Sequence, residues 1–283
     1  MNKSIIIKKT IKPFNKVINV EGDKSLSIRW ALLASQAKGK SKSFNLLKSE
    51  DVINTLNCLR KLGIKVKLKK NSCEIIGKNL NGYKYRKNLI LNAGNSGTLG
   101  RLLAGLMVHA EEKVKIIGDK SLSKRDFLRV TKPLKKFGAN FKTNKGKLPI
   151  YISGTTSPKP IRYFEDKGSA QIKSSIMLAA LNTNGTTVIK AKKSRDHTEL
   201  LFKFLGLKIK INKRKNYDLI KIEGGKKIKP LNYNIPSDIS SSSFFIVLTA
   251  LSNNSTLKIK NVNINPTRVG LIKILNMMGI KIK

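Results

Sequence analysis

Hydrophobic and polar positions along this chain follow a helical period that changes to strict alternation at four places. At each place the last turn of an amphipathic helix is followed by a glycine and then by an alternating strand. Glycine adopts the left-handed conformation without strain, so each of these glycines is a predicted helix C-cap. The four segments are LRKLGIKVK (Leu59–Lys67, with Gly63), LKKFGANFK (Leu134–Lys142, with Gly138), LFKFLGLKIK (Leu201–Lys210, with Gly206) and LNMMGIKIK (Leu275–Lys283, with Gly279).

These glycines are 75, 68 and 73 residues apart, which indicates a repeated supersecondary unit with two helices. The predicted helices are Ser25–Ala37, Asp51–Leu62, Gly97–Ala110, Arg125–Phe137, Ala170–Leu181, Asp196–Leu205, Ile239–Leu251 and Arg268–Met278. Short strands lie between them, as in LILNA, KVKIIG, LPIYIS, TTVIKA and YDLIKIEG. The pattern β-α-β-α-β-β therefore occurs three times, and the fold class is α+β, a mixed α/β fold.

The fourth repeat reaches only its strand IKIK, so one domain is predicted to be complete and a second to be partial. Residues 16–228 form the complete domain of three repeats, and residues 229–283 form the first repeat of the other. The polar, Pro-containing segment KKIKPLNYN marks this boundary. Residues 1–15 hold the predicted strand SIIIKK, which we assign to the partial domain.

The formal charge of +42 arises from 58 Lys and Arg residues against 16 Asp and Glu residues. A nucleic-acid surface would gather such charge into clusters with interleaved aromatic residues. Here the lysines are spread evenly among Ile and Asn, and no block of five or six like charges occurs. We therefore interpret the charge as compositional bias; a preference for anionic small molecules and a dedicated nucleic-acid surface are the alternatives.

Neither the cysteines nor the histidines have the spacing of a metal site. Cys58 and Cys73 read as buried thiols, and His109 and His197 are too few to complete a set of ligands. The N-terminus has only three consecutive apolar residues, which predicts neither a signal peptide nor a membrane span. We expect a cytoplasmic protein.

The hexapeptide GDKSLS occurs at Gly22–Ser27 and again at Gly118–Ser123. In the first copy Lys24, Ser25 and Arg29 place a cation, a hydroxyl and a guanidinium at a predicted helix start, where free N–H groups attract an anion. The second copy continues as GDKSLSKRDFLR and again predicts a helix start with cations. An ordinary capped helix with solvated cations is the alternative for each copy.

Three further segments supply hydrogen-bond donors at predicted helix starts. They are NAGNSGTLGR (Asn92–Arg101), GSAQIKSS (Gly168–Ser175) and SRDHTE (Ser194–Glu199). A repeat fold that brings several such helix starts together would form a site for a multiply anionic small molecule.

Seven ordered blocks resemble the EPSP synthases of the enolpyruvyl transferase family. The blocks are GDKSLSIR, NAGNSGTLGRLLAGL, GDKSLSKRDFLRV, SAQIKSSIMLAAL, SRDHTE, PSDISSSSFF and NINPTRVG, and the resemblance covers essentially all 283 residues. It implies two domains of three β-α-β-α-β-β units each. This chain would then hold one whole domain and about two thirds of the family pattern.

The resemblance also implies site residues. Lys24 would touch both substrates and is the candidate catalytic residue, as a proton donor or charge stabiliser. Gly97, Arg125 and Gln171 would contact phosphoenolpyruvate. Shikimate 3-phosphate would be bound by Ser25, Arg29, Ser169, Ala170 (through its backbone), Gln171, Ser194 and Arg195.

The implied reaction transfers the enolpyruvyl group of phosphoenolpyruvate to the 5-hydroxyl of shikimate 3-phosphate, in the shikimate pathway to chorismate and the aromatic amino acids. It requires no metal and no organic cofactor. The family's catalytic Asp, with its neighbouring Glu and Lys, has no counterpart here, and Asp238 does not take that role. We therefore expect the chain alone to be weakly active or inactive, with a complementing C-terminal polypeptide as a candidate partner. Gly97 implies sensitivity to glyphosate if the full site exists.

Two other functions remain open from the sequence. One is a noncatalytic anion-binding protein derived from the enzyme. The other is a nucleic-acid protein similar to RNA 3′-terminal phosphate cyclases, whose only support is the charge of +42.

Overall fold

The computed structural model describes residues 11–283, which divide into two compact units. The larger unit is Lys24–Ile235, and the smaller unit combines residues 11–23 with Pro236–Lys283. The chain passes between the units after Asp23 and after Ile235, whereas the sequence predicts domain limits after residues 15 and 228. The predicted strand SIIIKK lies outside the described residues.

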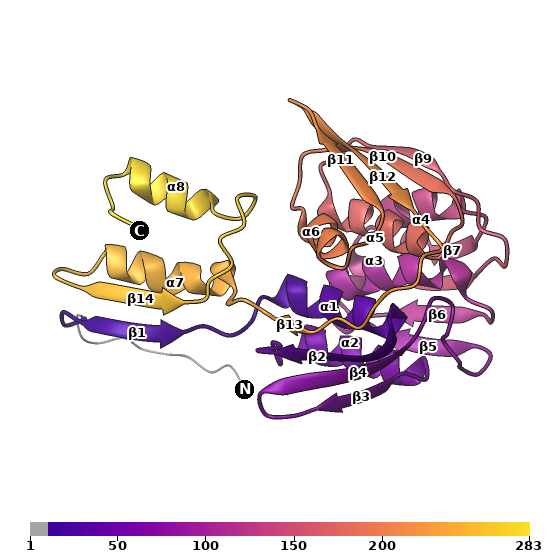
Figure 1. Cartoon of the computed structure of the whole chain (residues 1–283), viewed down its shortest axis with the longest axis horizontal. Coiled ribbons are helices and arrows are strands. Elements are labelled where there is room, and N and C mark those ends of the chain that lie inside the picture. Colours follow the sequence, from indigo (N-terminus) through magenta and orange to yellow (C-terminus); the bar gives the residue numbers. More distant parts are fainter. Residues whose placement is uncertain (1–10) are drawn as a thin grey trace. The chain divides into compact units, whose positions relative to one another are not determined.

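The larger unit consists of six α-helices and three four-stranded sheets, so the predicted mixed α/β fold is confirmed (Figure 1). The helices are α1 (Lys24–Gln36), α2 (Glu50–Lys61), α3 (Gly97–Leu106), α4 (Leu128–Lys135), α5 (Ala170–Leu181) and α6 (His197–Phe204). Two 3₁₀ turns are η1 (Met107–His109) and η2 (Leu122–Lys124). The last two strands of each of these repeats form an antiparallel hairpin within one sheet, and residues 233–234 of the fourth repeat add the edge strand of the first sheet.

The first sheet has the order β13-β2-β4-β3, the second β5-β6-β8-β7 and the third β11-β12-β10-β9. Their strands are β2 (Lys38–Phe44), β3 (Lys65–Leu68), β4 (Ser72–Lys78), β5 (Leu89–Asn92), β6 (Val114–Ile117), β7 (Asn140–Asn144), β8 (Lys147–Ser153), β9 (Arg162–Glu165), β10 (Thr186–Lys192), β11 (Ile209–Lys213), β12 (Tyr217–Glu223) and β13 (Tyr233–Asn234).

The first helix of each repeat lies in the core, and the second covers one face of it. Buried positions make up 11 of 13 residues in α1, 9 of 10 in α3 and 11 of 12 in α5. In α2 they make up only 5 of 12. The long strands β4, β8 and β10 alternate buried and more exposed positions, as expected for sheets with one face on a core. Trp30 of α1 is fully buried and donates its indole N–H to the Leu231 carbonyl at 3.0 Å.

The smaller unit contains β1 (Asn15–Asn19), α7 (Ile239–Ala250), β14 (Thr256–Lys260) and α8 (Gly270–Met277). Strand β1 precedes α1 in the chain yet pairs with β14, and β13 precedes α7 yet pairs with β2. Both pairings are parallel, as are β5 with β6 and β9 with β10 in the other repeats. The first and fourth repeats have thus exchanged their first strands.

Two predictions of local structure are wrong. Residues 280–283 do not form a strand, because the corresponding strands of the complete repeats are held by the hairpin strand that follows them, and IKIK has no such neighbour within residues 11–283. The second hexapeptide does not start an α-helix. Leu122 donates its backbone N–H to Asp119 Oδ1 at 2.7 Å, where the 3₁₀ turn η2 begins, and α4 begins only at Leu128.

Candidate functional site

The predicted site residues all lie in the larger unit, at or near the starts of its helices. Lys24 and Ser25 open α1, Gly97 opens α3, and Ala170 and Gln171 open α5. Ser194 and Arg195 precede α6, and Arg125 follows the 3₁₀ turn η2. The site is therefore built from all three repeats of this unit.

Arg29 joins the first and third repeats. It is 5% exposed, and its Nε donates to Thr198 Oγ1 of α6 at 2.8 Å. One terminal nitrogen donates to Ser174 Oγ of α5 at 3.1 Å, and the other donates to the Ser25 carbonyl at 3.1 Å. Ser174 and Thr198 also bond to each other at 2.7 Å. These contacts hold the guanidinium, which keeps its positive charge in proteins, in one orientation.

Gln171 joins the second and third repeats. Its Oε1 accepts from Arg101 of α3 at 2.8 Å, and its Nε2 donates to Thr98 Oγ1 at 3.2 Å. Arginine has donors only, so Arg101 fixes which end of the Gln171 amide faces it. The amide nitrogen of Gln171 retains one N–H for an acceptor such as a phosphate or carboxylate oxygen.

Gly97 leaves room for two guanidinium groups. A Cβ atom at this position would lie 2.6 Å from a terminal nitrogen of Arg101 and 3.3 Å from one of Arg125. Arg101 also donates to the Gly97 carbonyl at 3.3 Å and to the Asp126 carbonyl at 3.1 Å. A side chain at position 97 would therefore have to displace positive groups from the start of α3.

Positive charge is concentrated around Arg101. Its guanidinium lies 4.8 Å from the ring centre of Phe127, and the residue is 3% exposed. The pKa of Arg101 is lowered to about 10, chiefly by burial and also by the charges of Arg129 and Arg125. An anion bound beside these residues would relieve that repulsion.

The second hexapeptide positions Arg125 through a chain of side chains. Arg125 donates to Asn95 Oδ1 at 3.0 Å, and Asn95 Nδ2 donates to Asp119 Oδ2 at 2.6 Å. The pKa of Asp119 is below its ordinary value, chiefly because its carboxylate accepts the Leu122 N–H. This hexapeptide therefore fixes a cation beside α3 instead of starting a helix.

The start of α5 is shaped by Glu165. This fully buried carboxylate accepts the backbone N–H groups of Lys167 and Ser169, both at 3.0 Å. Gly168 has a φ of +64°, which glycine adopts without strain. The Ser169 hydroxyl caps the helix by accepting the Ile172 N–H at 3.4 Å. Ala170 carries no polar side chain, so only its backbone can meet an anion there.

Lys24 forms an ion pair with Asp51 of α2. Its Nζ is 3.0 Å from Asp51 Oδ2, and its side chain is 48% exposed. Such a half-exposed pair contributes about 0.2–1 kcal/mol and is readily opened by a competing anion. Ser194 contributes a buried hydroxyl that has no hydrogen-bond partner within residues 11–283, whereas Arg195 is exposed.

Sequence reasoning missed four residues that organise the site: Asp51, Arg101, Ser174 and Thr198. Arg101 lies four residues after Gly97, on the same helical face, and this spacing could have indicated it. Ser174 and Thr198 lie within the quoted blocks SAQIKSSIMLAAL and SRDHTE, but their pairing across two helices has no local signal.

A group of three or more His, Cys, Asp or Glu residues arranged to hold a metal ion is absent from the described residues 11–283. No helix in the same part of the chain is long and apolar enough to cross a membrane. The groups that the site does present are hydrogen-bond donors and cations, which suit phosphate and carboxylate groups.

Comparisons with known proteins point to one family. The model of the EPSP synthase (3-phosphoshikimate 1-carboxyvinyltransferase) family matches residues 8–283. A 3-phosphoshikimate 1-carboxyvinyltransferase of Vesicomyosocius okutanii is 41% identical over 274 residues, which are 95% of this chain and 62% of that protein. One from Streptococcus mutans is 38% identical over 94% of this chain and 62% of its own length.

The fold agrees with these sequence comparisons. The structure of EPSP synthase from Acinetobacter baumannii superposes with a TM-score of 0.86 at 36% identity, covering 94% of this chain and 60% of that one. The chain therefore spans about three fifths of the length of the relatives it matches. The noncatalytic and nucleic-acid alternatives receive no support from the comparisons.

Proposed function

Since the chain belongs to the EPSP synthase family, we propose that it takes part in the transfer of the enolpyruvyl group from phosphoenolpyruvate to the 5-hydroxyl of shikimate 3-phosphate. In this reaction the hydroxyl loses its proton and its oxygen adds to C2 of phosphoenolpyruvate. The methylene carbon of phosphoenolpyruvate takes up a proton in the same step. Loss of phosphate and of a proton then gives the enol ether. Both substrates carry phosphate, and one also carries the carboxylate beside the reacting carbon.

The observation that carries this proposal is the linked set of donors in the larger unit. Arg29 is fixed by Ser174 and Thr198, and Gln171 is fixed by Arg101. Both sets converge on α5, whose first turn contains Gln171 and whose second turn contains Ser174. Prepositioned donors of this kind bind anions without the entropic cost of ordering flexible side chains.

Shikimate 3-phosphate is the proposed ligand of the α5 start and its neighbours. Ser169 and the backbone of Ala170 would meet its phosphate with Gln171, since free N–H groups at a helix start favour an anion. The buried hydroxyl of Ser194, which lacks a hydrogen-bond partner among residues 11–283, supports a role for that residue in the same pocket. Ser25, Arg29 and the exposed Arg195 would complete the binding site.

Phosphoenolpyruvate is the proposed ligand of the cations beside α3. Arg125 and Gln171 would bind its anionic groups, and the absence of a side chain at Gly97 would leave it room. Lys24 would exchange Asp51 for a substrate and then donate a proton or stabilise charge, which a half-exposed lysine can do.

We also propose that a second polypeptide completes the catalytic site. Helices α7 and α8 and the residue that follows α7 expose large apolar side chains, among them Phe244 at 80%, Leu251 at 82% and Met277 at 87%. The relatives are longer than this chain, which spans 62% of their length. A polypeptide equivalent to the remaining part of a relative would cover these side chains and supply the carboxylates that proton transfer requires.

A cytoplasmic location is part of the same proposal. The two cysteines, Cys58 and Cys73, are buried free thiols, and a reducing compartment keeps thiols in that state.

The proposal is tested by calorimetric titration of shikimate 3-phosphate into the purified chain. We expect micromolar binding that weakens about tenfold or more in Lys24→Ala and in Gln171→Ala, since each removes a donor to the phosphate ligand. Lys213→Ala is the matched control, because Lys213 is an exposed residue of β11.

Activity is tested by phosphate release from phosphoenolpyruvate, with and without the purified C-terminal part of the Streptococcus mutans relative. We expect release only from the mixture. Full activity of the chain alone would refute the requirement for a second polypeptide. Absence of shikimate 3-phosphate binding both alone and in the mixture would refute the proposed function.

A further inference from the structure

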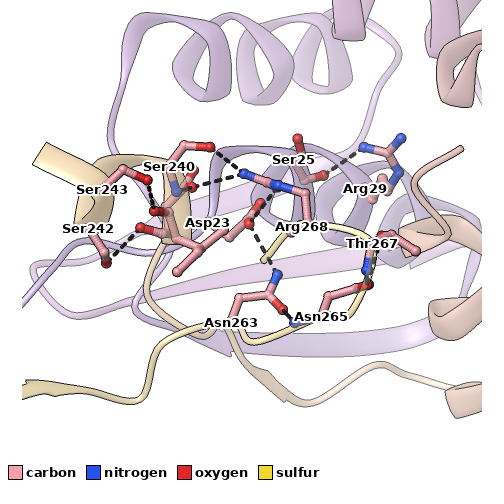
Figure 2. A network of polar contacts seen from close by, with 12 residues as sticks. Asp23, Ser25, Arg29, Ser240, Ser242, Ser243, Asn263, Asn265, Thr267 and Arg268 are labelled. Atoms are coloured by element: carbon pink, nitrogen blue, oxygen red, sulfur yellow. Dashed lines mark hydrogen bonds and ion pairs between the residues drawn. The ribbon is translucent and has the colours of Figure 1, made fainter. Parts of the chain in front are cut away.

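Arg268 of the smaller unit bridges two carboxylates (Figure 2). One terminal nitrogen lies 3.2 Å from Asp23 Oδ2, and the other lies 3.3 Å from Asp238 Oδ1. The second nitrogen also donates to Ser240 Oγ at 2.5 Å. The Arg268 side chain is 8% exposed and that of Asp23 is fully buried, so water screens these charges weakly.

The two carboxylates stand at the two places where the chain leaves and re-enters the smaller unit. Asp23 is the last residue before α1, and Asp238 lies two residues after Pro236, where the unit resumes. Asp238 caps α7, since its Oδ1 accepts the Ser240 N–H at 2.8 Å. Asn263 donates its side-chain amide to Asp23 Oδ2 at 3.2 Å.

The backbone joins the same two segments. Asp23 donates its N–H to the Pro236 carbonyl at 2.8 Å, and Asp238 donates to the Glu21 carbonyl at 3.0 Å. The Ser237 hydroxyl donates to the Val20 carbonyl at 2.6 Å. Residues 20–23 and 236–238 are thus held side by side, and Arg268 closes the arrangement from a third segment.

The positive charge of Arg268 balances the negative charges of Asp23 and Asp238 in this arrangement. Two carboxylates and one guanidinium meet in a largely buried cluster, with the amide of Asn263 as a further donor to Asp23. Without Arg268 the two carboxylates would repel each other, and the buried Asp23 would lose the ion pair that Arg268 forms with it. Either effect would release the backbone that Asp23 anchors.

We propose that Arg268 is a positioning residue for Lys24 and Ser25, and that it acts through Asp23. Both the side chain and the N–H of Asp23 are fixed, and the next peptide bond leads directly to Lys24. The start of α1, with its two predicted substrate-binding residues, is thereby set from residue 23. The effect on substrate rests on the proposed function, whereas the effect on the backbone does not.

The second hexapeptide supports this inference by contrast. In that copy the Asp119 carboxylate accepts hydrogen bonds from the Leu122 N–H and from Asn95. Asp119 forms no ion pair with an arginine within the described residues. It forms a 3₁₀ turn where the first copy leads into a helix of 13 residues. The partner of the aspartate, contributed by the segment NINPTRVG, distinguishes the two copies.

The test is hydrogen exchange, followed peptide by peptide in the full chain. In Arg268→Met we expect amides of residues 21–27 to exchange about tenfold faster or more, while those of α5 keep their rate. Arg268→Lys keeps the charge and should restore part of the protection, which a loss of packing alone would not explain. Arg214→Met is the matched control, since Arg214 is exposed.

Affinity for shikimate 3-phosphate is the second readout. We expect Arg268→Met to weaken binding about tenfold, with Arg268→Lys intermediate. Unchanged exchange at residues 21–27, or an equal increase in α5, would overturn the positioning role. If the unaltered chain binds the ligand neither alone nor with the complementing polypeptide, the proposed function fails, and the exchange rates still decide whether Arg268 holds Asp23.

Discussion

Helices α5 and α7 have the same length and the same kind of sequence, but their surroundings differ. Each has 12 residues, and in each the apolar residues lie on every side of the helix: AQIKSSIMLAAL in α5 and ISSSSFFIVLTA in α7. Eleven residues of α5 are buried, whereas only Ile239 and Ser242 are buried in α7. A helix that is apolar all round is expected to be buried on all sides, and only α5 meets that expectation.

The difference lies in the neighbours. Helix α5 packs against α3, α4 and the strands β10 and β12, which belong to two repeats. For α7 the described residues provide β14 as its main neighbour. The comparison teaches that a repeat of this kind buries its first helix only when other repeats surround it, which is the physical basis for proposing a second polypeptide.

The largest effect is expected from removing the charge inside α5. Lys173 is fully buried, and its Nζ lies 2.5 Å from Glu199 Oε1. Lys173→Met would leave the buried Glu199 carboxylate without its counter-charge, which typically destabilises a protein by about 3–5 kcal/mol. Urea unfolding followed by the fluorescence of Trp30, the single tryptophan, measures this loss in the larger unit.

The same variant should be less destabilised at low pH. Burial raises the pKa of Glu199 above its ordinary value, and loss of Lys173 would raise it further. A buried carboxyl with a raised pKa costs little folding stability while it is protonated. The protein loses stability as pH rises through that pKa, because the charged form is then buried. The loss at pH 5 should therefore be smaller than at pH 8. Equal losses at both values would contradict this, and Lys167→Met, in an exposed pair, is the control.

The second prediction applies the same kind of truncation to both helices. Met177 of α5 is fully buried, so Met177→Ala should destabilise the larger unit by about 2–5 kcal/mol through lost burial and a cavity. Phe244 of α7 is 80% exposed, so Phe244→Ala should change the free energy of unfolding of the smaller unit by no more than about 0.5 kcal/mol.

Trp30 fluorescence reports the first change, and hydrogen exchange of residues 239–250 reports the second. A large loss in Phe244→Ala would show that the chain in solution already covers α7. In the presence of the complementing polypeptide the same substitution should weaken the complex, because the side chain is then buried.

Much of the fold could be predicted from local pattern. The bounds of α5 coincide with the predicted ones, Ala170–Leu181. All four glycines predicted as C-caps have a positive φ: Gly63 at 79°, Gly138 at 108°, Gly206 at 66° and Gly279 at 87°. Helical period and C-cap chemistry depend on residues close in sequence, so the sequence alone suffices for them.

The contacts that organise the site could not be predicted in this way. Arg101 meets Gln171 across 70 residues, and Arg29 meets Thr198 across 169. The two hexapeptides show the limit most directly, because identical residues fold differently once Asp23 pairs with Arg268 and Asp119 pairs with its own loop. Such pairings depend on how segments distant in the sequence pack together, so a local sequence pattern cannot predict them.

The third prediction concerns the close approach of α3 to α5. A Cβ atom on Gly105 of α3 would overlap the backbone carbonyl of Ser175 in α5. Gly105→Ala should therefore destabilise the larger unit by about 1–3 kcal/mol, because a backbone atom cannot move aside as a side chain can. Trp30 fluorescence in urea measures the loss, and a more stable variant would show that the two helices separate easily.

The smallest effect has the opposite sign and belongs to the smaller unit. Gly270 is the first residue of α8, and a Cβ atom there would meet nothing within 4 Å. Alanine reduces the freedom of the unfolded chain and favours the helix, so Gly270→Ala should stabilise α8 by about 0.4–1 kcal/mol. Slower hydrogen exchange of residues 270–277 would measure this gain. If exchange were faster instead, α8 would have a close neighbour at Gly270, and the contrast between a crowded larger unit and an open smaller one would fail at that helix.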